Sequence, residues 1–463
     1  DASNYRVVPQ VIAYPRDRAD LEATLAAARE LALPITLRGG GTSVAGNAIG
    51  PGLVIDTSRH LTRILDVNTE ERTARVEPGV VMSTLQRHIA ATGLRFGPDP
   101  STSTRATFGG MIGNNACGPH AVAYGRTADN VVELSAVDGT GRRLTASRGS
   151  LAPIPGLEEL VKANLALIRT EFGRFSRQVS GYSLEHLLPE LGADLARFLV
   201  GTEGTLATVL DATVRLVPVA PHRTTLVLAY ADMPSAADAV VPLLAHKPHA
   251  VEGLDARLVK RVAEFRATGG IPELPHGAGW LFIEVGADSE EEVRDNLAGI
   301  IRDAGTTSYR VVEDPAEAAQ LWSIRADGAG LAGRSDSNKE SWPGWEDAAV
   351  PPEKLGAYLR DFDELMDRHG VTGQPFGHFG DGCIHVRLDI PLQHDGAPLR
   401  AFMEDAAALV ASHGGSLSGE HGDGRARSEL LPAMYSAKAI DLFKAVKHLF
   451  DPSNLLNPGV LVD

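Results

Sequence analysis

The stretch Gly377-His378-Phe379-Gly380-Asp381-Gly382-Cys383-Ile384-His385 (GHFGDGCIH) is the one around which this 463-residue chain is organised. Asp381-Gly382 predicts a two-residue hairpin turn, because a type I′ turn needs positive φ at both central positions. With the turn there, His378 faces His385 on one side of an antiparallel pair. Residues directly opposite have Cβ atoms about 4.5–5.5 Å apart. Two such imidazoles can chelate one divalent metal if a third ligand arrives from elsewhere.

The best candidate for that third ligand lies in the stretch SGEHG, residues 418–422, where Glu420 and His421 are adjacent between glycines. A surface hairpin with two unrelated histidines explains the same spacing equally well. Asp381 is interpreted as the turn residue rather than as an acid, because Asp favours turns.

Composition limits the classes of function. Apolar residues make up 43% of the chain, charged residues 22%, and the formal net charge is −15. This excess of acid argues against nucleic acid as a partner, which would require a basic patch. Two cysteines, Cys117 and Cys383, are too few for a disulfide scaffold or for an iron–sulfur cluster built from this chain alone.

The length suggests two to four domains. No run of 18 apolar residues and no signal peptide is found, so we expect a cytoplasmic location. The chain starts at Asp1 rather than at Met, which indicates processing or a part of a longer protein.

Three loops rich in glycine and small polar residues interrupt the first half of the chain. They are residues 38–47 after a predicted strand, residues 98–118, and residues 201–205 before another strand. Backbone N–H groups in such loops can converge on an anion without hindrance from Cβ atoms. A large polar cofactor would require loops of this kind, although three unrelated turns are the alternative.

The pattern changes near residues 218–221, which is the expected domain boundary. Beyond it, strands and helices alternate in a way that predicts an antiparallel sheet with helices on one face. Helices are expected at 315–329, 352–369, 397–413 and 436–450, and a mobile loop at 334–347.

Six motifs in order resemble the flavin-linked oxidases and dehydrogenases of the vanillyl-alcohol oxidase superfamily. They are the loops at 38–47 and 98–118, GTEGTLA at 201–207, GHFGDGCIH at 377–385, SGEHG at 418–422 and DPSNLLNPG at 451–459. The resemblance is to the branch of D-lactate, glycolate-type and D-2-hydroxyglutarate dehydrogenases. WPGWEDAAVPP at 342–352 is typical of members fused to a C-terminal iron–sulfur half, which would make this chain the flavoprotein half.

The resemblance implies an α+β fold: a two-subdomain FAD-binding domain of the PCMH type, an antiparallel-sheet, ferredoxin-like cap domain, and C-terminal helices. The expected domains are residues 1–219 for FAD, 220–450 for the cap and substrate, and 451–463 for a tail returning to the flavin.

The implied cofactor is non-covalent FAD, because no histidine lies between Arg38 and Asn47, where some members attach the flavin. The implied FAD-binding residues share glycine-rich or polar loops; they are Arg38, Gly39, Gly40, Gly41, Thr42, Ser43, Gly46, Asn47, Pro98, Gly109, Gly110, Asn114, Asn115, Gly118, Glu203, Gly204, Thr205 and Asn457.

The resemblance also implies a divalent metal on His378, His385 and Glu420, with zinc expected first and manganese or iron as alternatives. His421 would be the catalytic base, and Arg325 would bind the substrate carboxylate. Two departures stand out. Cys383 replaces an asparagine of many relatives, and Trp345 stands where some hydroxyglutarate enzymes carry a lysine.

The implied activity is oxidation of a D-2-hydroxy acid, D-lactate or D-2-hydroxyglutarate, to the 2-keto acid. Electrons would leave through an iron–sulfur domain outside this chain rather than through NAD. Two kinds of partner stay open. One is a second copy of the chain in a homodimer, and the other is a membrane to which the chain attaches peripherally through the respiratory chain. There are two alternative functions. One is a metallohydrolase that uses His378, His385 and Glu420, and the other is a non-catalytic flavin module.

Overall fold

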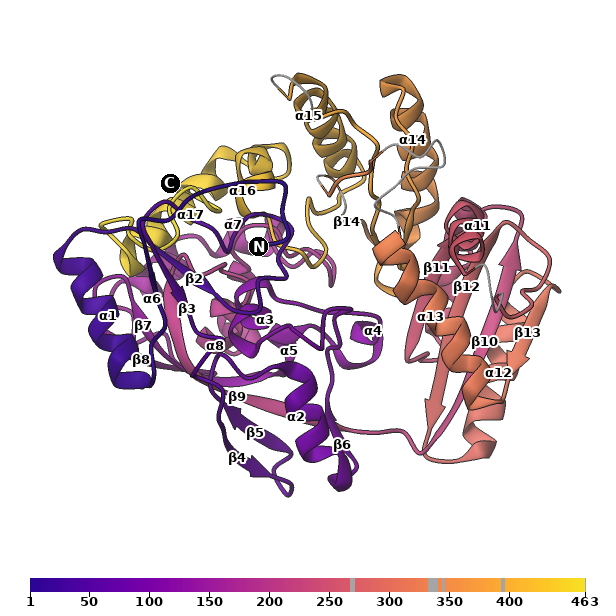
Figure 1. Ribbon diagram of the computed structural model, residues 1–463, viewed down its shortest axis with the longest axis horizontal. Coiled ribbons are helices and arrows are strands. Elements are labelled where there is room, and N and C mark those ends of the chain that lie inside the picture. The colour runs from indigo at the N-terminus through magenta and orange to yellow at the C-terminus, as the bar shows by residue number, and fades with distance from the viewer. Residues whose placement is uncertain (267–270, 332–339, 344, 346, 393–395, 463) are drawn as a thin grey trace. The chain divides into compact units, whose positions relative to one another are not determined.

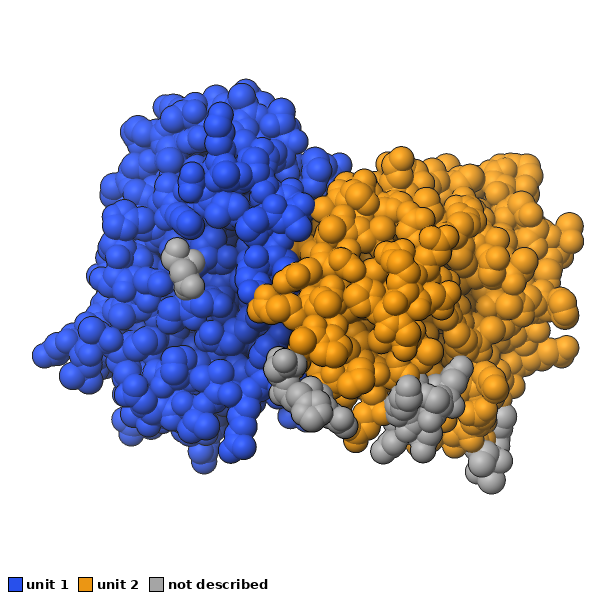
Figure 2. Space-filling model, turned by 90° about the horizontal axis from the view of Figure 1, so that it is seen from above, with its two compact units in different colours: residues 1–118, 124–219, 420–463 blue, residues 119–123, 220–419 orange. Residues whose placement is uncertain are grey.

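The computed structural model describes residues 1–266, 271–331, 340–343, 345, 347–392 and 396–462. The chain divides into two compact units, coloured in Figure 2. Unit 1 comprises residues 1–118, 124–219 and 420–463, and unit 2 comprises residues 119–123 and 220–419. The units change at residues 219–220, where the composition changes, and the chain returns to unit 1 at Glu420. The expected loop at 334–347 falls largely outside the described residues.

Unit 1 contains two sheets, a parallel one and an antiparallel one (Figure 1). The parallel sheet has the order β1-β3-β2, with β1 at Val11–Ala13, β2 at Ile35–Arg38 and β3 at Leu53–Asp56. Helix α1, Arg18–Glu30, packs on it through Leu21 and Leu25. The hydrophobic spacing along α1 explains this, because residues four apart share one face of a helix.

The antiparallel sheet of unit 1 has the order β4-β5-β9-β7-β8, and β6 also pairs with β9. Its strands are β4 Ile64–Asn68, β5 Thr73–Val76, β6 Leu94–Phe96, β7 Val131–Asp138, β8 Arg143–Ser147 and β9 Ala207–Pro218. The other helices of unit 1 are α2 Met82–Ile89, α3 Phe108–Asn114, α5 Thr127–Asn130, α6 Leu157–Ala163, α7 Leu165–Glu171, α8 Leu195–Leu199, α16 Gly424–Arg427 and α17 Ala437–Phe450; the short α4, Ala121–Tyr124, begins in unit 2.

Unit 2 is built on an antiparallel sheet of order β13-β10-β12-β11-β15 (Figure 1). The strands are β10 His222–Tyr230, β11 Ala250–Asp255, β12 Gly279–Ala287, β13 Tyr309–Val312 and β15 Phe376–His378; a separate pair joins β14 Ala348–Ala349 to β16 Cys383–Ile384. The helices are α9 Met233–Asp238, α10 Val240–Leu244, α11 Ala256–Phe265, α12 Glu290–Asp303, α13 Pro315–Leu331, α14 Leu355–His369 and α15 Ala397–Ser412.

The expectation of helices on one face of this sheet is wrong, because both faces are covered. Trp280 and Phe282 on β12 pack in one hydrophobic cluster with residues of α11 and α13. Leu281 and Ile283 point the other way and are also fully buried. Helices α9 and α12 both contact β12. A strand buried on both faces needs apolar residues at successive positions, which is what GWLFIEV provides.

Helix α14 packs against α15 within unit 2, and these two helices lie side by side in Figure 1. Helix α17 in unit 1 begins after Ser436, whose hydroxyl accepts a hydrogen bond from the amide of Ala439 and so caps the helix. Among the described residues, no helix combines the length and apolar character needed to cross a membrane.

Candidate functional site

The two histidines of the hairpin lie together in unit 2, but not in the predicted register. Phe376, not His378, pairs with His385, through hydrogen bonds in both directions. Gly382 has φ of +73°, whereas Asp381 is not among the residues with positive φ, so the turn is a short 3₁₀ turn rather than type I′. The reason is long-range pairing: β15 joins β11 and β16 joins β14, so the two strands separate into different sheets.

His378 and His385 still approach one another, with ring centroids 5.0 Å apart and planes at 87°. Both are buried, with 2% and 4% of their surface exposed. The predicted proximity of the two imidazoles therefore holds, although the predicted strand register does not.

A buried carboxylate fixes the orientation of His378. Glu252 on β11 lies opposite His378 in the strand register, and its Oε1 is 2.7 Å from His378 Nδ1. Arg325 on α13 donates from Nε to Glu252 Oε2 at 2.8 Å, and its Nη2 lies 3.3 Å from His378 Nε2. Since a guanidinium can only donate, Nε2 is the acceptor nitrogen and Nδ1 carries the proton. The lone pair that a metal would use is therefore on Nε2, where a metal would take the place of the contact with Arg325.

The same contacts keep Glu252 ionised. Burial raises the pKa of Glu252, but His378 and Arg325 outweigh it and hold the pKa below its ordinary value. Glu252 escaped the sequence analysis. Its only signal was a charged residue within the strand Ala250–Asp255, which is buried at every position.

In unit 1, the first glycine loop packs directly on the second polar loop. A Cβ on Gly39 would lie 2.2 Å from Thr107 Oγ1, and one on Gly40 would lie 2.2 Å from the carbonyl oxygen of Arg105. These positions accept only glycine, because any side chain would push the two loops apart. The two stretches, predicted separately, thus form one surface.

Asparagine side chains connect five of the predicted segments within unit 1. Asn47 Nδ2 donates to Asn114 Oδ1 at 2.6 Å, and Asn114 Nδ2 donates to the carbonyl oxygen of His421 at 2.8 Å. Asn457 Nδ2 donates to the carbonyl oxygens of Asn47 and Glu203, both at 2.8 Å. The polar loops, the SGEHG stretch and the C-terminal tail therefore converge.

Glu203 anchors the segment that follows His421. Its carboxylate accepts the amides of Asp423 at 2.7 Å and Gly424 at 2.9 Å. Burial, and then the neighbouring carboxylate of Asp423, raise the pKa of Glu203 to about 8. Its own amide donates to the carbonyl oxygen of Gly113 at 2.9 Å. Glu203 thus ties the third polar loop to the second.

Glu420 is held in unit 1 by two donors. The amide of Gly118 donates to its Oε2 at 2.8 Å, and Arg177 Nη1 donates to the same oxygen at 3.3 Å. Arg177 is fully buried and also contacts the carbonyl oxygen of Gly118. Arg177 was missed, because nothing in its local sequence marks it.

Two of the predicted FAD-binding side chains bond to the protein itself. Asn115 Oδ1 accepts the amide of Ala128, and the hydroxyl of Thr205 bonds to Tyr182 and to the carbonyl oxygen of Thr202. The remaining predicted FAD-binding residues also lie in unit 1; they are Arg38, Gly41, Thr42, Ser43, Gly46, Pro98, Gly109, Gly110 and Gly204. His378, His385 and Arg325 lie in unit 2, whereas Glu420 and His421 belong to unit 1, so the metal triad as a whole stays a prediction.

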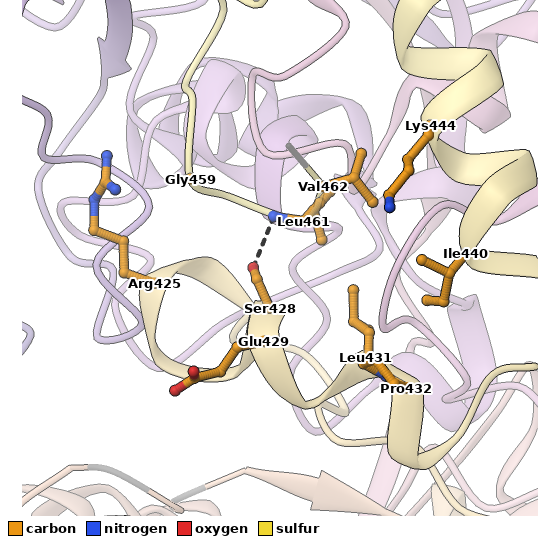
Figure 3. Close-up of a pocket in the computed structure, with 10 residues that line it drawn as sticks. All are labelled: Arg425, Ser428, Glu429, Leu431, Pro432, Ile440, Lys444, Gly459, Leu461 and Val462. Carbon is orange, nitrogen blue, oxygen red and sulfur yellow. Dashed lines mark hydrogen bonds between the residues drawn. The ribbon is translucent and has the colours of Figure 1, made fainter. Parts of the chain in front are cut away.

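A pocket of about 530 Å³ lies elsewhere in unit 1 (Figure 3). It is lined by Arg425, Ser428, Glu429, Leu431, Pro432, Ile440, Lys444, Gly459, Leu461 and Val462. Ser428 Oγ accepts the amide of Leu461 at its edge. None of the predicted cofactor, metal or catalytic residues lines it, so the loop network is the stronger candidate site.

Comparison with known proteins agrees with this geometry. The family model described as "FAD linked oxidases, C-terminal domain" matches residues 219–461, which is more than half of the chain. The model described as "FAD binding domain" matches residues 9–147. The chain belongs to the FAD-linked oxidases.

Relatives of this FAD-linked oxidase include a D-2-hydroxyglutarate dehydrogenase of Pseudomonas putida, 34% identical over 99% of the chain and 49% of the relative. A D-lactate dehydrogenase of Archaeoglobus fulgidus is 30% identical over 98% of the chain and 91% of the relative. The chain spans about half the length of the first of these two. A structure of p-cresol methylhydroxylase with bound substrate has a TM-score of 0.70 at 14% identity, covering 98% of this chain and 89% of that one, and shows the fold alone.

The predicted fold class is confirmed: the FAD-linked oxidase has an α+β FAD-binding domain of the PCMH type and a C-terminal oxidase domain with an antiparallel sheet. The converging loops fit FAD, since closely packed glycines let backbone N–H groups approach a polar cofactor.

Proposed function

We propose that this chain oxidises a D-2-hydroxy acid, D-lactate or D-2-hydroxyglutarate, to the 2-keto acid with FAD and a divalent metal. The observation that carries the proposal is the buried group Glu252–His378–Arg325. A carboxylate that orients a histidine is typical of metal sites, because it fixes the tautomer and raises the basicity of the ligand. The relatives named for hydroxyglutarate and lactate support the substrate class.

Chain connectivity supports Glu420 as the third ligand. Within unit 2, the amide of Gly419 donates to Asp347 at 2.9 Å, and a Cβ on Gly419 would meet Cys383 Sγ at 2.6 Å. Glu420 follows Gly419 directly, and consecutive Cα atoms are about 3.8 Å apart. When bound, the metal supplies Lewis acidity that lowers the pKa of the substrate hydroxyl.

Arg325 has the chemistry to bind the substrate carboxylate. It is 6% exposed and lies over the ring of Phe376, with Cζ 5.5 Å from the centroid. Glu252 fixes its Nε edge, so the guanidinium is oriented before substrate binds. Asn114 fixes the backbone of His421, whose imidazole would remove the hydroxyl proton as general base.

The loops at 38–47, 98–118 and 201–205 would hold FAD together with Asn457. When bound, FAD supplies the hydride acceptor for the substrate carbon. We expect non-covalent binding, since no histidine lies between Arg38 and Asn47. The metallohydrolase alternative gives these loops no role.

The test is anaerobic titration of the protein loaded with FAD and metal. We expect D-lactate or D-2-hydroxyglutarate to bleach the flavin, whereas the L-enantiomers leave it yellow. Stripping the metal with a strong chelator should abolish bleaching, and zinc or manganese should restore it. A yellow protein that no D-2-hydroxy acid bleaches would favour the non-catalytic flavin module and reject the proposal.

The number of cysteines in the chain bears on the electron acceptor. Two cysteines cannot build a four-thiolate cluster, so we propose that electrons leave to an iron–sulfur partner. An artificial dye should reoxidise the reduced protein rapidly, oxygen slowly, and NAD not at all. Reoxidation by air at the dye rate, with stoichiometric hydrogen peroxide, would make it an oxidase.

A further inference from the structure

Asp347, Cys383 and His385 form a second group of metal-binding side chains, entirely within unit 2. Their ligand atoms all lie within 4.8 Å of one another. Asp347 and Cys383 are fully buried, and His385 is 4% exposed. Each of the three offers a different donor: oxygen, sulfur and nitrogen.

Strand pairing places the three residues together. Ala348 pairs with Ile384 and Ala349 pairs with Cys383, between β14 and β16. Continuing this antiparallel register by one residue puts Asp347 opposite His385. The backbone, rather than a chance rotamer, therefore brings the carboxylate to the histidine.

The orientation of Asp347 leaves one oxygen toward the other two donors. Ser418 Oγ donates to Oδ2 at 2.5 Å, and the amide of Gly419 donates to the same oxygen at 2.9 Å. The other oxygen, Oδ1, lies 3.5 Å from Cys383 Sγ and 3.9 Å from His385 Nδ1. One oxygen is thus fixed by the protein, and the other is presented to sulfur and nitrogen.

The 3.5 Å between Asp347 Oδ1 and Cys383 Sγ matches an edge of a metal coordination tetrahedron, whereas the 3.9 Å between Oδ1 and His385 Nδ1 is longer than such an edge and would have to shorten when a metal binds. With metal–oxygen and metal–nitrogen bonds of about 2.0–2.1 Å and metal–sulfur bonds of about 2.3 Å, neighbouring ligand atoms lie roughly 3.3–3.8 Å apart. The 3.9 Å between Asp347 and His385 is too long for a hydrogen bond. By contrast, Glu252 and His378, a hydrogen-bonded pair in the same unit, are 2.7 Å apart.

We propose that Asp347, Cys383 and His385 bind a thiophilic divalent ion, zinc by preference, with Cys383 as a thiolate and the fourth position open. Metal binding replaces the thiol proton, which leaves to solvent. A sulfur donor favours zinc over manganese or magnesium, which prefer oxygen. The site uses His385 Nδ1; binding the metal proposed with His378 through Nε2 at the same time would require His385 as an imidazolate, whose ring proton also leaves to solvent. The inference does not rest on the proposed oxidation.

The test is zinc K-edge X-ray absorption on the metal-stripped 463-residue chain, reloaded with zinc at one and at two equivalents. We expect a sulfur neighbour at about 2.3 Å from zinc. Cys383→Ser should remove that signal and weaken zinc binding by about tenfold or more. Cys117→Ser removes the only other cysteine and should leave the sulfur signal unchanged.

The parent spectrum decides the question even if Cys383→Ser fails to fold. Zinc with only nitrogen and oxygen neighbours would show that the Cys383 thiol merely hydrogen-bonds to Asp347, and would overturn the inference. If such zinc still restores bleaching by a D-2-hydroxy acid, the proposed function survives alone. A sulfur signal without bleaching would uphold the inference and reject the proposed function.

Discussion

Glu252 Oε1 lies 2.7 Å from Nδ1 of His378, a residue 126 positions later in the chain and directly opposite it in the register of β11 and β15. This pair gives the imidazole a fixed tautomer before any metal arrives. The proposed metal would therefore meet a histidine whose donor atom is already defined.

Glu252→Gln tests that relationship. The amide keeps the shape but loses the charge, so we expect metal affinity to fall about 10- to 100-fold. Competition with a chromogenic chelator measures the change. The matched control is Asp303→Asn, which alters another carboxylate–histidine pair of unit 2, with His246 at 2.7 Å, and should leave metal affinity unchanged. Parent-like affinity in Glu252→Gln would remove Glu252 from this role.

Arg325→Lys should weaken substrate binding while leaving flavin content unchanged. A lysine cannot contact Glu252 and a carboxylate in the same fixed geometry. Loss of a charged hydrogen bond of about 1.5–3 kcal/mol corresponds to a rise in KM of roughly 10- to 150-fold. Steady-state kinetics with the bleaching substrate measure it. Arg360→Lys, at an exposed pair with Asp238, is the control. An unchanged KM would contradict the assignment.

His421→Asn should lower kcat by about 10²- to 10⁴-fold, the usual effect of losing a general base. The backbone carbonyl that accepts from Asn114 is retained, so the loops should keep their flavin. Flavin absorbance per polypeptide and single-turnover rates separate the two effects. His413→Asn, at a pair in which His413 is half-buried and Asp361 is exposed, is the control. A variant within threefold of the parent would exclude His421 as the base.

The pKa shifts of Glu185 and His186 predict opposite pH dependences of the free energy of unfolding. These two dependences cancel in the parent protein. Burial raises the pKa of Glu185 to about 7, although Arg126 opposes it, and burial and then Arg126 lower the pKa of His186 to about 3. Between pH 4.5 and 6.5, the folded pair carries one proton, on Glu185. The unfolded pair also carries one, on His186, so no net proton is exchanged.

Each single variant should therefore reveal the dependence of the free energy of unfolding on pH that comes from the remaining residue. In Glu185→Gln, His186 remains neutral when folded and charged when unfolded, so stability rises with pH from 4.5 to 6.5. In His186→Gln, Glu185 binds its proton only when folded, so stability falls as pH rises from 4.5 to 7. Each slope, relative to the parent, should reach about 1.4 kcal/mol per pH unit in denaturant titrations. His88→Gln, at an exposed position, should match the parent; equal slopes in all variants would contradict the prediction.

The sequence by itself determined the features that depend on local chemistry. The glycines at 39 and 40 and the asparagines at 47 and 457 marked loops that do converge in unit 1. Gly382 marked a tight turn, and its positive φ is present. Such signals are readable because backbone conformation and side-chain size act within a few residues.

Only the tertiary structure decided which distant groups meet. The register of His378 followed from its pairing with β11, which outweighs the turn preference of Asp381-Gly382. Glu252, Arg177 and Asp347 have no local signature, because their roles come from partners far along the chain. A buried charge is stable only with its partners in place, and those partners are set by strand pairing and packing rather than by neighbours in sequence.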